Sequence, residues 1–217
     1  MTAALHPDLL QRLQTLASGP RRLLGIAGAP GSGKSTLAAL AADALGASAQ
    51  AVPMDGFHLA QTELVRQGCA DRKGAPHTFD AAGYAALLRR LRSQPSGETV
   101  YAPDFRRDLE EPIAGALAVA ADTPLVISEG NYLLLETGAW AQVADLFDEI
   151  WFLQVDPALR LERLTRRHMQ FGRSREQALD WIAHNDEPNA VLIEASRHRA
   201  QRQIVWDDAQ GRFTLLD

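Results

Sequence analysis

One nine-residue segment constrains this chain more than any other part of it, because it fits the pattern G-x-x-x-x-G-K-[ST]: Gly28, Ala29, Pro30, Gly31, Ser32, Gly33, Lys34, Ser35 and Thr36. An apolar run at residues 23–27 precedes it and predicts a buried strand, and residues 35–45 predict a helix closed by Gly46. In that context the glycines allow backbone N–H groups to converge on phosphate oxygens, and the helix N-terminus adds roughly half a positive charge. We therefore expect all nine residues to form a phosphate-binding loop rather than a glycine-rich loop without a ligand.

Two side chains of this loop have specific expected roles. Lys34 is expected to bridge the β- and γ-phosphates of ATP, and the Ser35 hydroxyl is expected to bind Mg²⁺. The loop alone does not select one class of nucleotide-binding protein. However, the guanine-reading pattern N-K-x-D and the L-S-G-G-Q signature of transport ATPases are both missing from the sequence. The sequence therefore argues against GTPases and transport ATPases, and the remaining classes need a site for an acceptor.

Strands and helices alternate along the rest of the chain. Further strands are expected at residues 49–54, 99–102, 125–128 and 148–155, and a C-terminal hairpin at about 202–216. Helices are expected at residues 6–18, at 80–92 with Asp80 as N-cap, after Asp156-Pro157, and after Ser174 with Gln177 as its capping-box partner.

Strands joined by crossover helices predict a mainly parallel sheet with ligands at the carboxyl ends of its strands. The expected class is therefore α/β, with a P-loop NTPase fold, a mainly parallel five-stranded sheet flanked by helices, a lid and the C-terminal hairpin. We expect a single domain over residues 1–217, with a core at about 20–200.

The amino-acid composition limits the classes of partner that the protein can have. The chain has 217 residues, of which 46% are hydrophobic, and this is enough for one compact domain. The net charge of −5 argues against nucleic acid and against an anionic membrane surface, because both require clustered Lys and Arg. The apolar residues of the N-terminal segment are spaced for one helical face, so they predict neither a signal peptide nor a membrane span. With the single Cys69, which excludes an internal disulfide, we expect a cytoplasmic protein.

Four further motifs follow the loop in order: Asp55-Gly56-Phe57, Arg72-Lys73-Gly74-Ala75-Pro76, Phe79-Asp80 and Glu129-Gly130-Asn131-Tyr132. With these motifs the sequence resembles the superfamily of uridine kinases, type I pantothenate kinases and phosphoribulokinases over residues 20–200. It is most similar to the short bacterial branch of nucleoside/nucleotide kinases and fructose-transport-associated kinases.

The resemblance implies roles for four charged side chains. Asp55 is implied to activate the acceptor hydroxyl, although Asp-Gly is also a common turn pair. Glu129 is implied to lie near Mg²⁺ and the acceptor, and capping of its loop is the alternative. Arg163 and Arg167 lie four residues apart on one helical face and are implied to form a lid over the phosphates, with an exposed basic face as the alternative.

The residues expected to bind the acceptor lie in the loops between these motifs, where aromatic walls and a few polar groups typify small-molecule pockets: Phe57, His58, Arg72, Lys73, Tyr101, Asp104 and Arg106. Arg72 and Lys73 could instead be solvated charges, and His58 could be a solvent-facing or capping histidine.

These observations predict an ATP- and Mg²⁺-dependent kinase that transfers the γ-phosphoryl group to a hydroxyl of a small-molecule acceptor. The acceptor stays open among nucleoside-like, pantothenate-like and sugar compounds. The alternative is a nucleotide-dependent regulatory or chaperone-type NTPase without an acceptor, and the position of Asp55 in a polar loop suited to a ligand argues against it. Because related kinases are often dimers, a homodimer is one expected assembly.

Overall fold

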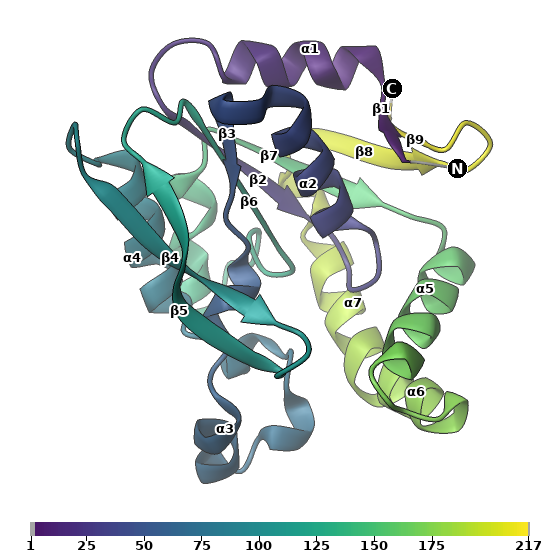
Figure 1. Ribbon diagram of the computed structural model, residues 1–217. Coiled ribbons are helices and arrows are strands. Elements are labelled where there is room, and N and C mark those ends of the chain that lie inside the picture. Colours follow the sequence, from purple (N-terminus) through teal and green to yellow (C-terminus); the bar gives the residue numbers. More distant parts are fainter. Residues whose placement is uncertain (1–2, 217) are drawn as a thin grey trace.

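Helices cover both faces of a seven-stranded sheet in the computed structural model, which describes residues 3–216 (Figure 1). The strand order is β1-β9-β8-β7-β2-β6-β3. The strands are β1 (Ala4–Leu5), β2 (Arg22–Ala27), β3 (Ala49–Ala51), β6 (Leu125–Gly130), β7 (Glu149–Gln154), β8 (Arg202–Asp207) and β9 (Arg212–Leu215). The five strands from β8 to β3 run parallel, β9 is antiparallel to β8, and β1 is parallel to β9. The α/β class, the mainly parallel sheet and the C-terminal hairpin are thereby confirmed.

Two strands form a separate antiparallel sheet, β4 (Thr99–Arg106) with β5 (Glu111–Ala120). Counting residues 99–102 among five strands of the main sheet was therefore wrong, and β8 occupies the fifth parallel position instead. The sequence of β5 contains Pro112 and Gly115 and lacks the alternation of apolar and polar residues that predicts a strand. Most of its residues are exposed.

Within residues 3–216, seven α-helices connect the strands: α1 (Pro7–Leu16), α2 (Lys34–Leu45), α3 (Gln61–Gln67), α4 (Ala81–Arg92), α5 (Pro157–Gln170), α6 (Arg175–Trp181) and α7 (Glu187–Ala195). A one-turn π-helix, η7 (Ile182–Asp186), joins α6 to α7. Short 3₁₀ turns fill several loops, among them η2 (Met54–Phe57), η3 (Ala70–Arg72) and η4 (Pro76–Thr78).

The helix starts expected from sequence are confirmed by hydrogen bonds. The Asp80 carboxylate accepts from the backbone N–H of Gly83 at 2.8 Å, and the Asp156 carboxylate accepts from the first turn of α5. Ser174 and Gln177 form both bonds of the capping box at the start of α6. These bonds satisfy N–H groups that a helix cannot pair internally, which is why short polar side chains fix the boundaries.

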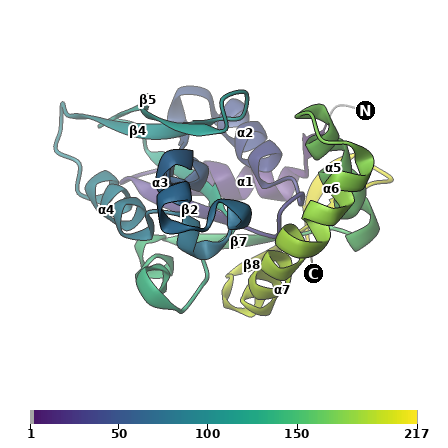
Figure 2. The same ribbon diagram turned by 90° about the horizontal axis from the view of Figure 1, so that it is seen from below.

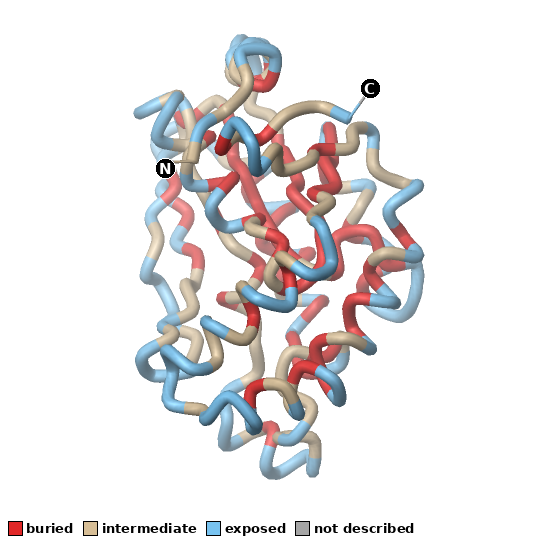
Figure 3. The backbone as a smooth tube through the Cα atoms, turned by 90° about the vertical axis from the view of Figure 1, so that its right-hand side faces the viewer, coloured by how far each residue is buried: buried red, intermediate tan, exposed pale blue. Residues whose placement is uncertain are grey.

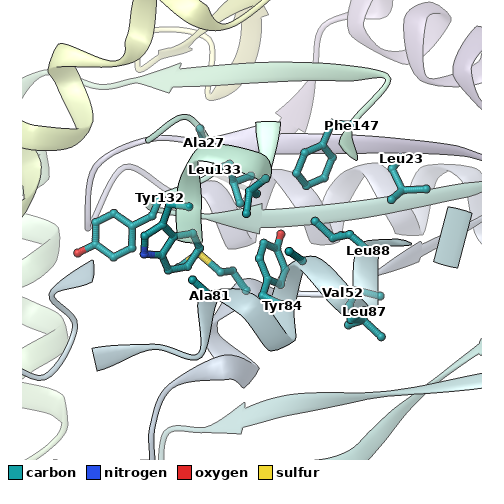
Figure 4. Close-up of a cluster of buried hydrophobic side chains, with 14 of the residues drawn as sticks. Leu23, Ala27, Val52, Ala81, Tyr84, Leu87, Leu88, Tyr132, Leu133 and Phe147 are labelled. Atoms are coloured by element: carbon teal, nitrogen blue, oxygen red, sulfur yellow. The ribbon is translucent and has the colours of Figure 1, made fainter. Parts of the chain in front are cut away.

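Two apolar cores lie on the two faces of the sheet, because successive residues of a strand point to opposite sides. On β2, Leu24 and Ile26 pack with α1 and α2, whereas Leu23 and Ala27 pack with α4 and the loop after β6. Figure 4 shows the second core, in which Tyr84 and Leu88 of α4 lie below Phe147 and Leu133. Figure 3 shows the buried residues gathered in the interior of the molecule, with exposed residues around them.

This arrangement places three groups of elements around the carboxyl ends of β2, β3 and β6. The hairpin β4–β5 stands on one side and helices α5 and α6 stand on the other in both Figure 1 and Figure 2, and α3 lies at the lower end in Figure 1. Among the helices within residues 3–216, none has the length and apolar character needed to cross a membrane.

Candidate active site

The glycine-rich loop connects β2 to α2 at the carboxyl edge of the sheet. Gly31 has φ +80°, and a Cβ there would lie 2.6 Å from the Leu164 side chain of α5, so only glycine fits. Lys34, Ser35 and Thr36 form the first turn of α2, where backbone N–H groups have no intrahelical acceptor. The loop therefore presents unpaired N–H groups and a helix N-terminus, which is the chemistry of an anion site.

Lys34 is buried at the centre of the site, and its Nζ donates to the Ala29 carbonyl at 3.1 Å. Burial lowers the pKa of Lys34 to about 8, and the nearby carboxylates Glu129 and Asp55 oppose that effect only in part. A lysine in this state gains strongly from an incoming anion, because the anion replaces the hydration that burial removed.

The Ser35 hydroxyl donates to Glu129 Oε1 at 2.7 Å, so the end of β6 meets the start of α2. Burial raises the pKa of Glu129, as does the neighbouring Asp55, whereas Lys34 and Ser35 act in the opposite direction. A hydroxyl and a carboxylate in contact beside a phosphate site form a donor set that suits Mg²⁺, which is commonly held by one or two carboxylates together with substrate phosphates and water. These residues fit the ion.

Asp55 lies in η2, directly after β3, and Arg107 Nη2 donates to its Oδ2 at 3.0 Å. Burial alone would raise the pKa of Asp55, yet His58, protonated at the low pH where this carboxyl titrates, and the cations Arg107, Lys34 and Arg167 hold it below its ordinary value. At neutral pH Asp55 is therefore ionised and able to accept a hydrogen bond.

His58 lies against the rings of Phe79 and Phe105, at centroid distances of 4.0 and 4.6 Å. Burial lowers its pKa, so the imidazole is neutral at pH 7, and its Nδ1 lies 2.8 Å from the Asp55 carbonyl. Because a carbonyl only accepts, Nδ1 carries the proton, which leaves Nε2 as a hydrogen-bond acceptor.

These groups line one cavity of about 440 Å³. From the residues expected by sequence it brings together Pro30, Lys34, Ser35, Asp55, His58, Lys73, Glu129 and Arg167. A second cavity of about 270 Å³ adjoins the loop and is lined by Gly31, Gly33, Lys34, Ser35, Thr36, Arg107, Arg163 and Arg167. Lys34, Asp55, Glu129, Arg163 and Arg167 thus each line one or both of two cavities that share lining residues.

Five residues expected to bind the acceptor lie outside the lining of both cavities. Phe57 packs edge-on against Tyr84 in the core, and Arg72 donates to the His184 carbonyl. The Tyr101 side chain is exposed on β4. The Asp104 carboxylate accepts from the N–H of Phe105, and Arg106 forms a surface ion pair with Asp108, so neither side chain is directed at the site.

Arg107 and Phe105 line the cavity in place of Asp104 and Arg106. If the alternation that begins with the buried residues Val100 and Ala102 continued along β4, residues 104 and 106 would lie on its inner side. The pairing of β4 with β5 shifts register between Ala102 and Asp104, so the alternation does not continue. The sequence analysis selected Arg106 of the adjacent pair Arg106-Arg107, whereas Arg107 lines the cavity.

The lid face of the site holds a hydrogen-bonded trio that sequence reasoning missed. His168 Nε2 lies 2.8 Å from Asp186 Oδ2, and Arg173 Nη1 donates to His168 Nδ1 at 2.7 Å. The Arg173 guanidinium also lies 4.1 Å from the centre of the Trp181 ring. All four residues line the larger cavity, and the trio ties α5 to the π-helix. His168 and Asp186 are 18 positions apart in the sequence, so no local pattern predicts their contact.

Helix α5 rests on the phosphate loop. Arg163 Nη1 donates to the Ser32 carbonyl at 3.2 Å, and Leu164 packs on Gly31. Burial lowers the pKa of Arg167, and the neighbouring Arg107 lowers it further. Arg163 and Arg167, one helical turn apart, therefore face the loop from the lid. Their positive charge is partly desolvated and lies where phosphates are expected to bind.

Comparison with known proteins agrees with this geometry. The model of the phosphoribulokinase / uridine kinase family matches residues 23–203. A proposed uridine kinase of Schizosaccharomyces pombe is 34% identical over 201 residues, which cover 87% of this chain and 85% of that protein. The uncharacterized protein YggC of Escherichia coli is 33% identical over 210 residues, with 94% of this chain and 86% of that protein covered.

A solved structure gives the same result. A proposed fructose transport system kinase from Silicibacter sp. TM1040 superposes with a TM-score of 0.81 at 38% identity, over 92% of this chain and 98% of that one. The sequence match, the shared fold and the phosphate-binding loop agree. The chain belongs to the phosphoribulokinase / uridine kinase family and is a kinase, a phosphotransferase with an alcohol group as acceptor.

Proposed function

We propose that the protein transfers the γ-phosphoryl group of ATP, with Mg²⁺, to a hydroxyl of a nucleoside-like, pantothenate-like or sugar metabolite. One observation carries the proposal: the Asp55 carboxylate and the Lys34 ammonium line the same cavity of about 440 Å³, which leaves room for an acceptor between them. A site that only hydrolysed ATP would need room for a single attacking water on that side of the phosphates, and not for an acceptor molecule.

The phosphate end of the cavity binds and orients the triphosphate. N–H groups of the loop and the first turn of α2 donate to phosphate oxygens, and Lys34 places its charge beside the β- and γ-phosphates. Ser35 and Glu129 would hold Mg²⁺, which when bound neutralises charge on the phosphates. Arg163 and Arg167 add positive charge from the lid, where charge spreads over the transferring group.

Asp55 orients the acceptor hydroxyl toward the γ-phosphorus. The hydroxyl oxygen forms the new bond to phosphorus, the bond to the β-phosphate oxygen breaks, and ADP leaves. The hydroxyl proton passes to the Asp55 carboxylate and then to solvent. A carboxylate with a low pKa suffices as acceptor, because the loose transition state of phosphoryl transfer allows the proton to leave late.

The proposal is tested by ATP consumption with and without a mixture of small hydroxylated metabolites, with phosphorylated products identified by mass spectrometry. A kinase consumes ATP slowly alone and much faster when its acceptor is present. Rapid hydrolysis without any metabolite, and no phosphorylated product, would instead support the regulatory or chaperone-type NTPase and overturn the proposal.

A further inference from the structure

Lys73 lines the larger cavity, and its ammonium group lies beside Gln61, Glu110 and Phe105. Lys73 lies between η3 and η4, and its Nζ is 5.6 Å from the centre of the Phe105 ring. The Arg107 guanidinium lies 5.8 Å from the same ring. Two cations from segments far apart in the sequence therefore converge on one aromatic wall beside Asp55.

The loop that carries Lys73 is fixed by its backbone. The Asn185 side chain donates to the Lys73 carbonyl at 2.8 Å, and the Asn189 side chain donates to the Gly74 carbonyl at 3.4 Å. The hydroxyl of Tyr132 donates to the same Gly74 carbonyl. Both asparagines are almost completely buried. Lys73 is therefore held in place before any ligand binds, which lowers the entropy cost of binding.

The ammonium itself is bound only to neutral atoms. Its Nζ donates to Gln61 Oε1 at 3.3 Å and to the Glu110 carbonyl. Glu110 has φ 54°, a backbone conformation that residues with side chains rarely adopt and that persists only where the surroundings impose it. Glu110 thus turns its carbonyl, not its carboxylate, to Lys73. Within residues 3–216, Lys73 forms no ion pair.

An ammonium has three N–H donors, so one of them is left for a ligand. Several other charges of the cavity have a partner or a proposed ligand, and the Glu110 carboxylate, which also lines the cavity, forms no ion pair with Lys73. Asp55 pairs with Arg107, and the phosphates of ATP are served by Lys34, Arg163 and Arg167 in the proposed function. A cation that is partly desolvated and lacks a counter-charge favours an anion over a neutral group.

We propose that the acceptor is a small alcohol that also carries an anionic group, a carboxylate or a phosphate, and that Lys73 binds this anion with Arg107 beside it. This inference rests on the proposed kinase function. The acceptor would place its hydroxyl at Asp55 and its anion at Lys73, and Arg107 lies between the two because it touches Asp55 and flanks Phe105. A neutral nucleoside would leave the Lys73 charge without compensation.

The first experiment divides a cell metabolite extract on an anion-exchange resin into an unbound fraction of neutral and cationic compounds and an eluted fraction of anions. Each fraction is incubated with the full-length protein and ATP labelled in the γ-phosphate. We expect labelled product from the eluted fraction only. Product from the unbound fraction overturns the inference and leaves the kinase function intact, whereas no product from either fraction overturns the proposed function itself.

The second experiment uses acceptors that differ only in their anion: glycerol against glycerate and glycerol 3-phosphate, and panthenol against pantothenate. Preference for the carboxylates or for the phosphate identifies the source of the anion. Lys73→Met should lower kcat/KM for the active acceptor by about 10- to 100-fold, the range for loss of one charge-assisted hydrogen bond, through a raised KM and with the ATP affinity unchanged.

The matched control is Arg66→Met, which removes one positive charge from the exposed face of α3, outside the cavity lining. It should leave kcat/KM unchanged. If Lys73 only tied the hairpin to its loop, Lys73→Met would lower the melting temperature and weaken charged and neutral acceptors alike. An unaltered preference between the two members of a pair in Lys73→Met would therefore overturn the inference.

Discussion

At the scale of single residues, the site lowers the pKa of a lysine, which opposes its positive charge, and the pKa of an aspartate, which favours its negative charge. Lys34 is buried, and its pKa falls to about 8, whereas Asp55 is surrounded by cations that lower its pKa. Such perturbations are frequent at functional sites, and here the buried charge of Lys34 costs stability whereas the ionised Asp55 contributes stability. Each can therefore be measured through folding or turnover.

The first prediction concerns the proton of Lys34. Its pKa of about 8 in the folded protein lies below the ordinary 10.5, so the unfolded chain binds more protons between these pH values and stability rises with pH there. Lys34→Met should raise the free energy of unfolding at pH 7 by about 2 kcal/mol, because it removes a buried charge. The difference should shrink between pH 8 and 10 in urea denaturation. A difference that stays constant over this range would contradict the assigned burial.

The second prediction separates binding from chemistry at Asp55. Asp55→Asn keeps the size of the side chain and removes its ability to take a proton. We expect kcat to fall by ~10²–10⁴, the range for a lost positioned base, with the Kd of ATP unchanged. Turnover kinetics and calorimetry of ATP binding measure the two quantities. Normal turnover in this variant would exclude Asp55 from the reaction.

At the scale of elements, α5 is both a lid and a support for the phosphate loop. Arg163, Leu164 and Arg167 lie on one helical face, and the first two contact the loop directly. Arg166, on another face, forms an exposed ion pair with Glu162. The face of the helix therefore decides which arginines can meet the phosphates.

The third prediction uses that difference between faces. Arg167→Ala should lower kcat by ~10- to 100-fold and weaken ATP binding much less, because the charge it compensates grows in the transition state. Arg166→Ala is the control and should have no effect beyond the small value of an exposed ion pair. Equal losses of kcat in both variants would show that the total positive charge of the helix sets the rate, and not the face on which each arginine lies.

Much of this element-scale picture follows from the sequence. Local signals fixed the phosphate loop, the caps at Asp80, Asp156 and Ser174, and the C-terminal hairpin, because each depends on neighbours within a few residues. The choice of Arg107 over Arg106 and the contact of His168 with Asp186 depend on strand register and on long-range packing. Those features arise only when distant segments meet, so no short pattern encodes them.

At the scale of the whole molecule, one buried carboxylate joins three elements. Glu149 on β7 accepts from Arg12 of α1 with Nε at 3.0 Å, from Arg202 of β8 at 2.6 Å, and from the Trp151 indole at 2.7 Å. Burial would raise the pKa of Glu149, but these donors lower it below its ordinary value. The network therefore connects the N-terminal helix α1 to the neighbouring strands β7 and β8.

The fourth prediction follows from linkage. Because the folded-state pKa of Glu149 is depressed, its contribution is present above the ordinary value of 4.5 and is lost as pH falls through the folded pKa. Glu149→Gln should lower the free energy of unfolding by about 3 kcal/mol at pH 7, and the variant should converge with the wild type in acid. Denaturation at pH 7 and below pH 4 measures both values, and kcat should be unaffected because Glu149 lies outside both cavities.

The contact between Gly31 and Leu164 has a mechanical consequence. Because Gly31 has no side chain, the Leu164 side chain and the Arg160 carbonyl of α5 pack directly against the loop backbone. A larger residue at position 31 would push α5 outward and carry Arg163 away from the loop.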